Sequence, residues 1–476
     1  LIFPLFKNGD VNEVNNYRGI SCLNALAKIF TALLLHRLEQ FVKANDLLSE
    51  FQAGFRRGYS AIDNIFVLQN IIHYKTREKG KKIYCFFIDL KSAFDTVDHS
   101  SLFLKLFNLG VSWKFMNILK AYYSLGISSV HCVDGMSEPI RVGAGVRHGC
   151  LLSPILFSLF VDDLPALLEG GVLIGGTKIK TLLYADDIVL LSDNPISLQR
   201  NINILETYCV QWNLSVNLEK SKIMIFRKGG RLAASEKWFY KNSRIEVVNR
   251  YKYLGIILTP RMSLVPHLEN KVSIAKLGLN RVWANFILNK NVPLDAKYRI
   301  FKSVSRAVLS YGAQSWGFQR YDILEKFQRF FLKKLFSLPS PTPNYVLSIE
   351  CALEPLETFT LALHFKYCLR TLALDNHRLP KIVATEIIQK KLFWFKHWLS
   401  MARDFSSDLS CTLNDRDKWS DQFSNLLNKI RSVRIEESFC RAGNSERFFL
   451  YKTLITDHKS FVTSSLFNNL RLSEIC

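Results

Sequence analysis

Two adjacent aspartates stand between two runs of aliphatic residues in the segment "LLYADDIVLLS" at 182–192. Leu182–Tyr184 and Ile188–Leu191 have the composition of short buried strands, so the two acids would occupy the turn of a hairpin. Burying a carboxylate costs free energy, and a neighbouring carboxylate adds repulsion. The segment therefore favours a compensating cation, most simply a divalent metal ion. A solvated Asp-Asp turn at a strand end is the alternative that these residues leave open.

A second acid ends a hydrophobic run in "IYCFFIDLKSAFDTVDH" at 83–99. Six apolar residues, Ile83–Ile88, lead into Asp89, and a helical pattern starts just after it. Asp89 alone could be a helix N-cap. Two strands that both end in acids together favour a metal–carboxylate site. Oxygen ligands without nearby His or Cys are typical of Mg²⁺ or Mn²⁺, and a pair of such ions about 4 Å apart serves phosphoryl transfer.

The charge balance of the chain predicts a polyanionic partner. The net charge is +22 over 476 residues, and it is spread over nearly every segment, so nucleic acid is the leading candidate. A membrane surface is the competing partner. No stretch reaches the roughly 18 apolar residues of a spanning helix, and the nearest one, "CLLSPILFSLFV" at 150–161, stops at two aspartates.

The order of the patterns predicts an α+β fold followed by a helical region. Short β-rich runs alternate with helical segments from 83 to 258, after an amphipathic helix around residues 24–43. Helical periodicity takes over after Pro260, and "SLPSPTPNY" at 337–345 is the clearest linker. Ten cysteines occur singly without a CxxC pair, so neither a zinc ribbon nor a disulfide framework is indicated.

Five segments stand in the order of motifs A to E of reverse transcriptases, and they carry a family resemblance. The segments are "FFIDLKSAFDTVDH", "GAGVRHGCLLSPILFSLFVDDL", "LLYADDIVLLS", "LSVNLEKSKIMIF" and "YKYLGIIL". Together they resemble the jockey-type reverse transcriptases of non-LTR, LINE-like retrotransposons. "LFKNGDVNEVNNYRGISCLNALAKIF" resembles the opening segment of that family. The resemblance covers residues 1 to about 260 and extends more loosely to about 375.

The resemblance implies a right-hand polymerase with fingers, palm and thumb and an antiparallel palm sheet. Residues 1–260 would form fingers and palm, 261–340 a helical thumb, and 341–476 a helical C-terminal region of unknown role. Two Mg²⁺ ions, or Mn²⁺, would be the cofactors. An upstream endonuclease is expected in the full-length element. The chain begins mid-pattern without methionine, which suggests an N-terminal truncation.

The catalytic roles that the resemblance implies fall on residues near the paired acids. Asp89 and Asp186 would ligate both ions, with Asp187 beside them as a weaker contributor. Lys220 in "NLEKSK" would donate a proton to departing pyrophosphate, although a solvated lysine is the alternative. A turn that grips the primer end would comprise Tyr253, Leu254 and Gly255. That string also fits a plain buried strand.

The nucleotide-binding roles fall on five further residues. Phe94 would pack against the deoxyribose and exclude a 2′-hydroxyl, unless it is simply a core aromatic residue. Arg18 and Lys7 would reach the triphosphate, or they are ordinary surface cations. Gly149 would permit close approach of the nucleotide. His148 departs from the family, which normally has glutamine there, and its imidazole is shorter and titrates near neutral pH.

The helical half offers candidate nucleic-acid contacts. Residues 294–311 place one apolar stripe and one basic stripe on a predicted helix, namely Ile300, Val304, Ala307 and Tyr311, and Arg299, Lys302 and Arg306. The basic stripe could follow a phosphate backbone or simply face solvent. Trp394 and Trp398 could stack on bases, but an aromatic core stripe is favoured. His364 and Cys368 lack companions for a zinc site.

These observations predict an RNA-directed DNA polymerase that extends a primer 3′-hydroxyl with dNTPs by two-metal phosphoryl transfer. Its partners would be an RNA template, a DNA primer or target, and dNTPs, without a membrane, and it would act inside the cell, at the nucleus. A non-catalytic nucleic-acid-binding relic of such an element is one alternative, and a maturase-like RNA-binding protein is another. Intact Asp89, Asp186 and Asp187 favour the enzyme.

Overall fold

The computed structural model describes residues 1–7, 9–132, 135–147, 149–234, 236–351, 353–409 and 416–448, together with residues 451 and 453. The chain divides into two compact units. Unit 1 holds Leu1–Leu254 and Thr259–Arg261, and unit 2 holds Gly255–Leu258 and the residues from Met262 onward. The chain passes between the units close to Pro260, where helical periodicity begins in the sequence.

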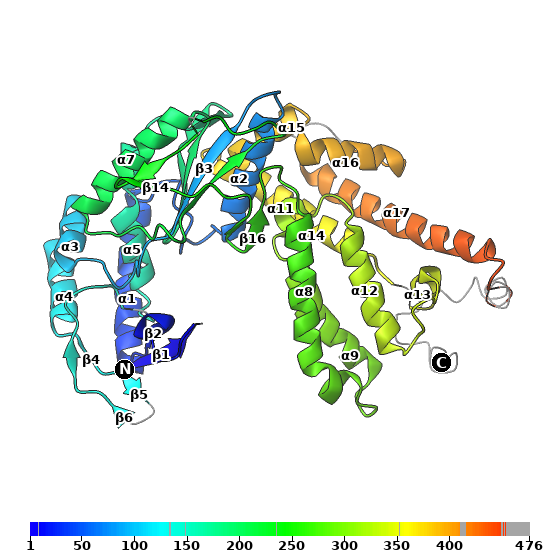
Figure 1. The fold of residues 1–476 in the computed structure, drawn as a ribbon, viewed down its shortest axis with the longest axis horizontal. Helices are drawn as coiled ribbons and strands as arrows, with labels where there is room; N and C mark the ends of the chain where they lie inside the picture. The colour runs from blue at the N-terminus through cyan, green and yellow to red at the C-terminus, as the bar shows by residue number, and fades with distance from the viewer. Residues whose placement is uncertain are drawn as a thin grey trace. The chain divides into compact units, whose positions relative to one another are not determined.

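A four-stranded antiparallel sheet forms the core of unit 1 (Figure 1), with the strand order β10–β11–β3–β12. Its strands are β10 (Thr181–Tyr184), β11 (Asp187–Ser192), β3 (Ile83–Ile88) and β12 (Lys222–Phe226). Every residue of β3 is buried. The strands and the hairpin predicted at 83–88 and 182–191 are confirmed, because both segments are apolar enough to be covered on two faces.

Both faces of this sheet are covered. Tyr84, Phe86 and Ile88 of β3 belong to one hydrophobic core, which residues of α3, α5 and α7 complete. On the other face of β3, the ring of Phe87 stacks on Tyr251 with centroids 4.4 Å apart. The helices of unit 1 are α1 (Ala25–Ala44), α2 (Ala61–Thr76), α3 (His99–Asn108), α4 (Trp113–Ser124), α5 (Ser153–Val161), α6 (Leu164–Leu167), α7 (Pro195–Gln211) and the 3₁₀ turn η1 (Val14–Asn16).

Short hairpins complete unit 1. They are β1 (Ile2–Phe6) with β2 (Tyr17–Ser21), β4 (Ile127–Ser128) with β7 (Ile140–Arg141), β5 (His131–Cys132) with β6 (Gly135–Met136), β8 (Val172–Ile174) with β9 (Thr177–Ile179), and β13 (Phe239–Tyr240) with β14 (Ser243–Arg244). The strand β15 (Tyr251–Tyr253) follows. The predicted helix around 24–43 is confirmed as α1, whose N-cap Asn24 accepts a hydrogen bond from the Ala27 amide at 2.7 Å.

The segment directly after Asp89 corrects one prediction. The sequence predicts a helix there, but residues 91–95 form turns and α3 begins only at His99. The chain continues to pair after β3, because Lys91 donates its amide to Ser215 O at 2.7 Å and Ser92 has a φ of +46°. The N-cap of α3 is Asp98, and its hydrogen bonds from Ser101 hold the pKa of this carboxyl below its usual range.

The described residues of unit 2 form helices together with the strand β16 (Ile256–Leu258). Its helices are α8 (Val265–Val282), η2 (Trp283–Ile287), α9 (Leu294–Ile300), η3 (Phe301–Arg306), α10 (Ala307–Leu309), α11 (Ala313–Trp316), α12 (Asp322–Leu335), α13 (Asn344–Glu350), α14 (Leu356–Leu372), α15 (Leu379–Gln389), α16 (Phe393–Asp404) and α17 (Arg416–Gly443). The predicted linker at 337–345 lies between α12 and α13 except for its last two residues, which begin α13. None of the described helices combines the length and apolar character needed to cross a membrane.

The buried face at 294–311 differs from the predicted apolar stripe. The buried residues there are Lys297, Tyr298, Phe301, Ser305 and Leu309, whereas Ala307 and Tyr311 of the predicted stripe are exposed. Tyr298, Phe301, Ser305 and Leu309 are three or four residues apart, so the buried face keeps the helical period although residues 301–306 are π-helical. The predicted period is confirmed, and the predicted face is wrong, because Tyr298, Phe301 and Leu309 give a second apolar stripe at the same spacing.

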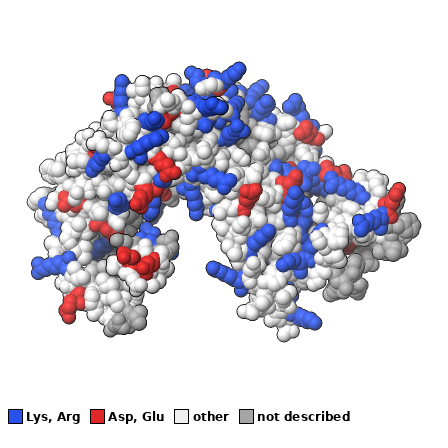
Figure 2. Space-filling model, viewed as in Figure 1, with Lys and Arg blue, Asp and Glu red and all other residues white. Residues whose placement is uncertain are grey.

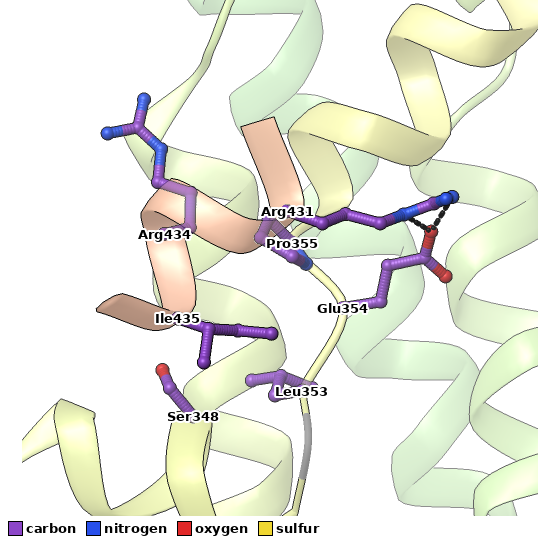
Figure 3. Close-up of a pocket in the computed structure, with 7 residues that line it drawn as sticks. All are labelled: Ser348, Leu353, Glu354, Pro355, Arg431, Arg434 and Ile435. Carbon is purple, nitrogen blue, oxygen red and sulfur yellow. Dashed lines mark hydrogen bonds and ion pairs between the residues drawn. The ribbon is translucent and has the colours of Figure 1, made fainter. Parts of the chain in front are cut away.

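Ion pairs join α17 to the segment that begins α14 (Figure 3). Arg431 donates from Nε and Nη2 to Glu354 Oε1 at 3.1 and 2.6 Å, as the dashed lines show. Arg434 Nη2 lies 3.3 Å from Glu357 Oε2, and this buried carboxylate is also 3.8 Å from Arg320. Arg431 and Arg434 are therefore both ion-paired, so the small pocket that they line belongs to the packing of α17 against this segment.

Trp394 and Trp398 are fully buried, which confirms the favoured prediction of a core stripe. Their rings lie against His364, with centroids 5.6 and 5.4 Å away. His364 Nδ1 is 2.7 Å from the carbonyl oxygen of Gln314, and Nε2 is 3.7 Å from Cys368 Sγ. Burial lowers the pKa of His364 to about 3, so the imidazole is neutral at physiological pH.

We expect this histidine to make the stability of unit 2 depend on pH. Below pH 6.5 His364 is protonated in the unfolded chain but stays neutral in the folded protein. The free energy of unfolding therefore falls as the pH drops from 6.5 towards 3. Between pH 7 and 5 the loss is about 2 kcal/mol. In urea titrations followed by tryptophan fluorescence, His364→Gln should lower overall stability but lose about 2 kcal/mol less over this interval. If the free energy of unfolding fell by the same amount in the variant and the wild type, His364 would not be the source of the pH dependence.

Candidate active site

The register of the central sheet brings three acids to one end. Ile188 of β11 pairs with Ile88 of β3, so the next residues outward, Asp187 and Asp89, lie at the same edge. Tyr184 pairs with Asp187 across the hairpin, which leaves Ala185 and Asp186 as its two-residue turn. The prediction that both acids of "YADD" lie where the hairpin turns is confirmed, with Asp187 as the first residue of β11.

The turn itself is strained. Ala185 is buried and has a φ of +58°, in the left-handed region that residues with a Cβ rarely adopt. Two-residue hairpin turns need such angles, and glycine or asparagine usually supplies them. An alanine held there costs about 1 kcal/mol or more, so the surroundings must determine the turn.

Gln52 is the residue that holds this turn, and sequence analysis missed it. Its side chain is fully buried, and its Oε1 accepts hydrogen bonds from the amides of Gly54 and Ala185 at 2.8 and 3.2 Å. Main-chain bonds join the same segments, since Leu183 donates to Phe51 O at 2.8 Å and Ala53 donates to Leu183 O at 2.9 Å. The segment 51–54 thus acts as an extra strand beside β10.

Gly54 explains why this contact is so close. A Cβ on Gly54 would lie 2.2 Å from the Ala185 nitrogen, so only glycine fits against the turn. In the sequence, "FQAGFRRGYS" indicated only a basic loop with glycines. The signal that could have identified Gln52 is a lone glutamine among apolar residues two positions before a glycine, and that pattern is weak without the fold.

The electrostatics of the site are those of crowded carboxylates. Desolvation of its carboxyl, and then the charges of Asp186 and Asp89, together raise the pKa of Asp187 to about 6, although this residue is exposed at the edge of the sheet. Lys220 Nζ lies 3.8 Å from Asp89 Oδ2, which supplies some positive charge. Asp89 is fixed through its backbone, because its amide donates to Ser221 Oγ at 3.0 Å and its carbonyl accepts from Asn217 at 2.8 Å.

Carboxylate oxygens are the kind of donor that a hard cation prefers, but these carboxylates do not supply a complete set of ligands. Within the described part of the chain, no group of three His, Cys, Asp or Glu side chains is close enough to hold a metal ion. Mg²⁺ is typically bound by one or two carboxylates, with water and substrate phosphates as the other ligands. The oxygen-only donors and the raised pKa of Asp187 therefore fit an ion whose remaining ligands come from substrate.

The loop that contains Gly149 lies against two other predicted site segments. Val146 donates its amide to Phe94 O at 2.7 Å. A Cβ on Gly149, whose φ is +86°, would lie 2.4 Å from the Ser21 oxygen at the end of β2. Phe94 is half-buried and stacks on Phe157 with centroids 4.8 Å apart. The structure thus places the loop that contains Gly149 beside the Phe94 segment and the end of β2, while His148 lies outside the described residues.

The other predicted residues have the following places. Arg18 and Lys7 are exposed on and beside the β1–β2 hairpin, where Arg18 pairs with Leu5. Tyr253 is buried, with its ring 5.4 Å from that of Phe87, so it is a core residue of unit 1. Leu254 and Gly255 follow it as a turn with φ values of +43° and +82°. Their predicted roles towards nucleotide and primer stay predictions.

Comparison with known proteins identifies the family. A family model described as reverse transcriptase (RNA-dependent DNA polymerase) matches residues 6–258. The chain is 29% identical over 327 residues to a probable RNA-directed DNA polymerase from transposon BS of Drosophila melanogaster, covering 66% of this chain and 35% of that protein. It is 28% identical over 360 residues to the RNA-directed DNA polymerase from mobile element jockey of Drosophila funebris, covering 72% and 38%.

The chain thus spans little more than a third of the length of these two relatives. A solved structure of telomerase from Candida tropicalis is more distantly similar, with a TM-score of 0.36, 14% identity and 52% of each chain covered. The resemblance to non-LTR retrotransposon reverse transcriptases is confirmed by the jockey and transposon relatives. Because the family model covers more than half of its residues, this chain belongs to the reverse transcriptase (RNA-dependent DNA polymerase) family.

Proposed function

We propose that this chain carries the polymerase activity of a non-LTR retrotransposon and extends a primer 3′-hydroxyl with dNTPs on an RNA template. The observation that carries the proposal is the gathering of Asp89, Asp186 and Asp187 at one end of a buried sheet. Like charges placed there raise the free energy of the empty site. A phosphate substrate that arrives with divalent cations relieves this repulsion.

Asp89 and Asp186 are the proposed ligands of two Mg²⁺ ions, with Asp187 as a weaker contributor. When bound, such ions stabilise the charge on the attacking and leaving oxygens of phosphoryl transfer. Lys220, 3.8 Å from Asp89, is proposed to hold the proton for the departing pyrophosphate. The Lys220 side chain is 70% exposed, so it is accessible to a substrate that binds beside the acids.

The remaining assignments are proposed from the family's architecture. Unit 1 would supply fingers and palm, and the helices at 261–340 would form the thumb that holds the template–primer duplex. Phe94 would exclude a 2′-hydroxyl, with Arg18, Lys7, His148 and Gly149 around the triphosphate. Tyr253, Leu254 and Gly255 would contact the primer end. RNA template, DNA primer and dNTPs are the proposed partners, and the nucleus is the proposed place of action.

Primer extension on an annealed RNA template tests the proposal with Asp186→Asn, which keeps the side-chain shape and removes the charge. The loss of a metal ligand removes several kcal/mol of transition-state stabilisation, so the rate should fall at least about 100-fold. The matched control is Asp193→Asn, at the opposite end of β11, which should extend normally. If wild type and both variants bind the duplex but none extends it, the chain is a non-catalytic relic.

Gln52→Met tests whether the buried amide positions the catalytic turn. Without Oε1 the amides of Gly54 and Ala185 lose their acceptor, so kcat should fall about 10- to 100-fold, while KM for dNTP and duplex affinity change little. Gln69→Met is the matched control, because Gln69 is equally buried on α2. Gln52→Glu keeps the acceptor and should recover part of kcat. Equal losses from Gln52→Met and Gln69→Met would assign Gln52 a general packing role.

His148→Gln tests the departure from the family at the nucleotide. An amide offers a donor and an acceptor at all pH values, whereas imidazole becomes cationic below about pH 6.5. We expect the glutamine variant to show a severalfold lower KM for dNTP and a flatter dependence of KM on pH between 6 and 8. An unchanged KM and pH profile would show that residue 148 does not contact the nucleotide.

A further inference from the structure

The end of the central sheet opposite the acids is strongly basic. Residues 75–82, which lead into β3, and residues 227–237, which follow β12, contain nine Lys or Arg and two Glu. Phe226 pairs with Ile83, so the two segments emerge side by side from adjacent strands. Figure 2 shows Lys and Arg side chains gathered at the top of the view, where the loop between α2 and β3 lies in Figure 1.

We define the distal basic surface by the side chains of these segments that face outward. Lys82 and Lys75 are excluded, because they pair with Glu236 and Asp193. The surface then consists of Arg77, Lys79, Lys81, Arg227, Lys228, Arg231 and Lys237, which are exposed except for half-buried Arg227. Among the described residues, Glu78 is the acid that offsets it directly, at 3.7 Å from Arg77.

A buried carboxylate holds the two segments together. Glu236 accepts hydrogen bonds from Lys82 Nζ at 2.6 Å, from the Tyr84 hydroxyl at 2.8 Å and from the Ala233 amide at 2.7 Å. Burial opposes its ionisation, but these bonds outweigh that effect and hold its pKa below the usual range. Lys228 Nζ also donates to Arg77 O at 3.2 Å. The exposed cations are therefore presented by a fixed scaffold.

The surface is separate from the catalytic site. Seven residues of extended chain connect Lys82 to Asp89, which corresponds to about 23 Å. A ligand on the distal basic surface would thus lie outside the space that the reacting nucleotide and the primer end occupy. We propose that the distal basic surface binds the phosphate backbone of a nucleic-acid segment away from the catalytic site.

The chemistry of the surface favours nucleic-acid backbone over other anionic partners. A protein surface that binds a membrane usually also inserts apolar side chains into it. In the described parts of these two segments, Leu232 is the one large apolar side chain that is exposed. Gly80, Gly229 and Gly230 have nothing near the position of a Cβ, so a phosphate can approach the main chain closely. Arg77 Cζ lies 4.7 Å from the centroid of the Tyr74 ring, so the guanidinium covers this ring. Binding at the surface would therefore rest on charge and not on stacking of bases.

The test compares two variants with equal loss of charge. The first carries Lys79→Gln, Lys81→Gln, Lys228→Gln and Arg231→Gln. The control carries Lys43→Gln, Lys114→Gln, Lys178→Gln and Arg200→Gln, four exposed cations elsewhere on unit 1. Binding of a long RNA, the same sequence as single-stranded DNA, and duplex DNA is measured with EDTA at several salt concentrations. Because no catalysis is involved, the result does not depend on the proposed polymerase activity.

We expect the first variant to bind at least about tenfold more weakly than the control and to lower the salt slope by about 3, as four lost phosphate contacts would. The probe with the largest loss identifies RNA or DNA as the ligand. A primer–template too short to reach from Asp89 to Lys82 cannot contact the distal basic surface, so the first variant should extend it at the wild-type rate. Equal affinities of the two variants for every nucleic acid would overturn the proposal. Loss of binding to phosphatidylserine vesicles alone would overturn it in favour of a membrane surface.

Discussion

Repulsion among three carboxylates at one end of the central sheet is the constraint on which the rest of unit 1 depends. Sheet register and a left-handed turn bring Asp89, Asp186 and Asp187 together, and desolvation together with the charges of the two neighbouring acids raises the pKa of Asp187 to about 6. Such a cluster persists only where the surrounding structure fixes it. Gln52 and Gly54 fix the turn from one side, and Lys220 supplies positive charge from the other.

The same sheet carries opposite charges at its two ends. Asp89 follows the last residue of β3, and a group of lysines and arginines precedes its first. Six buried apolar residues separate the two ends and keep water out of the middle. This arrangement agrees with the two proposals above: cations bound by the acids would meet the reacting phosphates of a long polyanion, and its distant phosphates would meet the basic side chains.

Sequence pattern predicted the parts of the site that lie on regular strands. Period and composition were enough for the hairpin around Asp186 and for the strand before Asp89, because those segments are apolar on both faces. It failed where two outcomes fit the same pattern. At 294–311 the buried face is rotated from Val304 to Phe301 and Ser305 at an unchanged helical spacing, and continued pairing after Asp89 replaced the expected helix. Propensity carries no signal for either event.

The sequence by itself determined the chemistry: oxygen donors at the ends of two hydrophobic strands, a large positive charge, and the order of motifs that marks a reverse transcriptase. Only the tertiary structure decided which residues support that chemistry. Gln52 is 133 residues from Ala185 along the chain, and Glu236 is 154 from Lys82, so neither contact can be read from local spacing. These side chains act through hydrogen bonds across adjacent segments, and such bonds exist only once the sheet has brought the segments together.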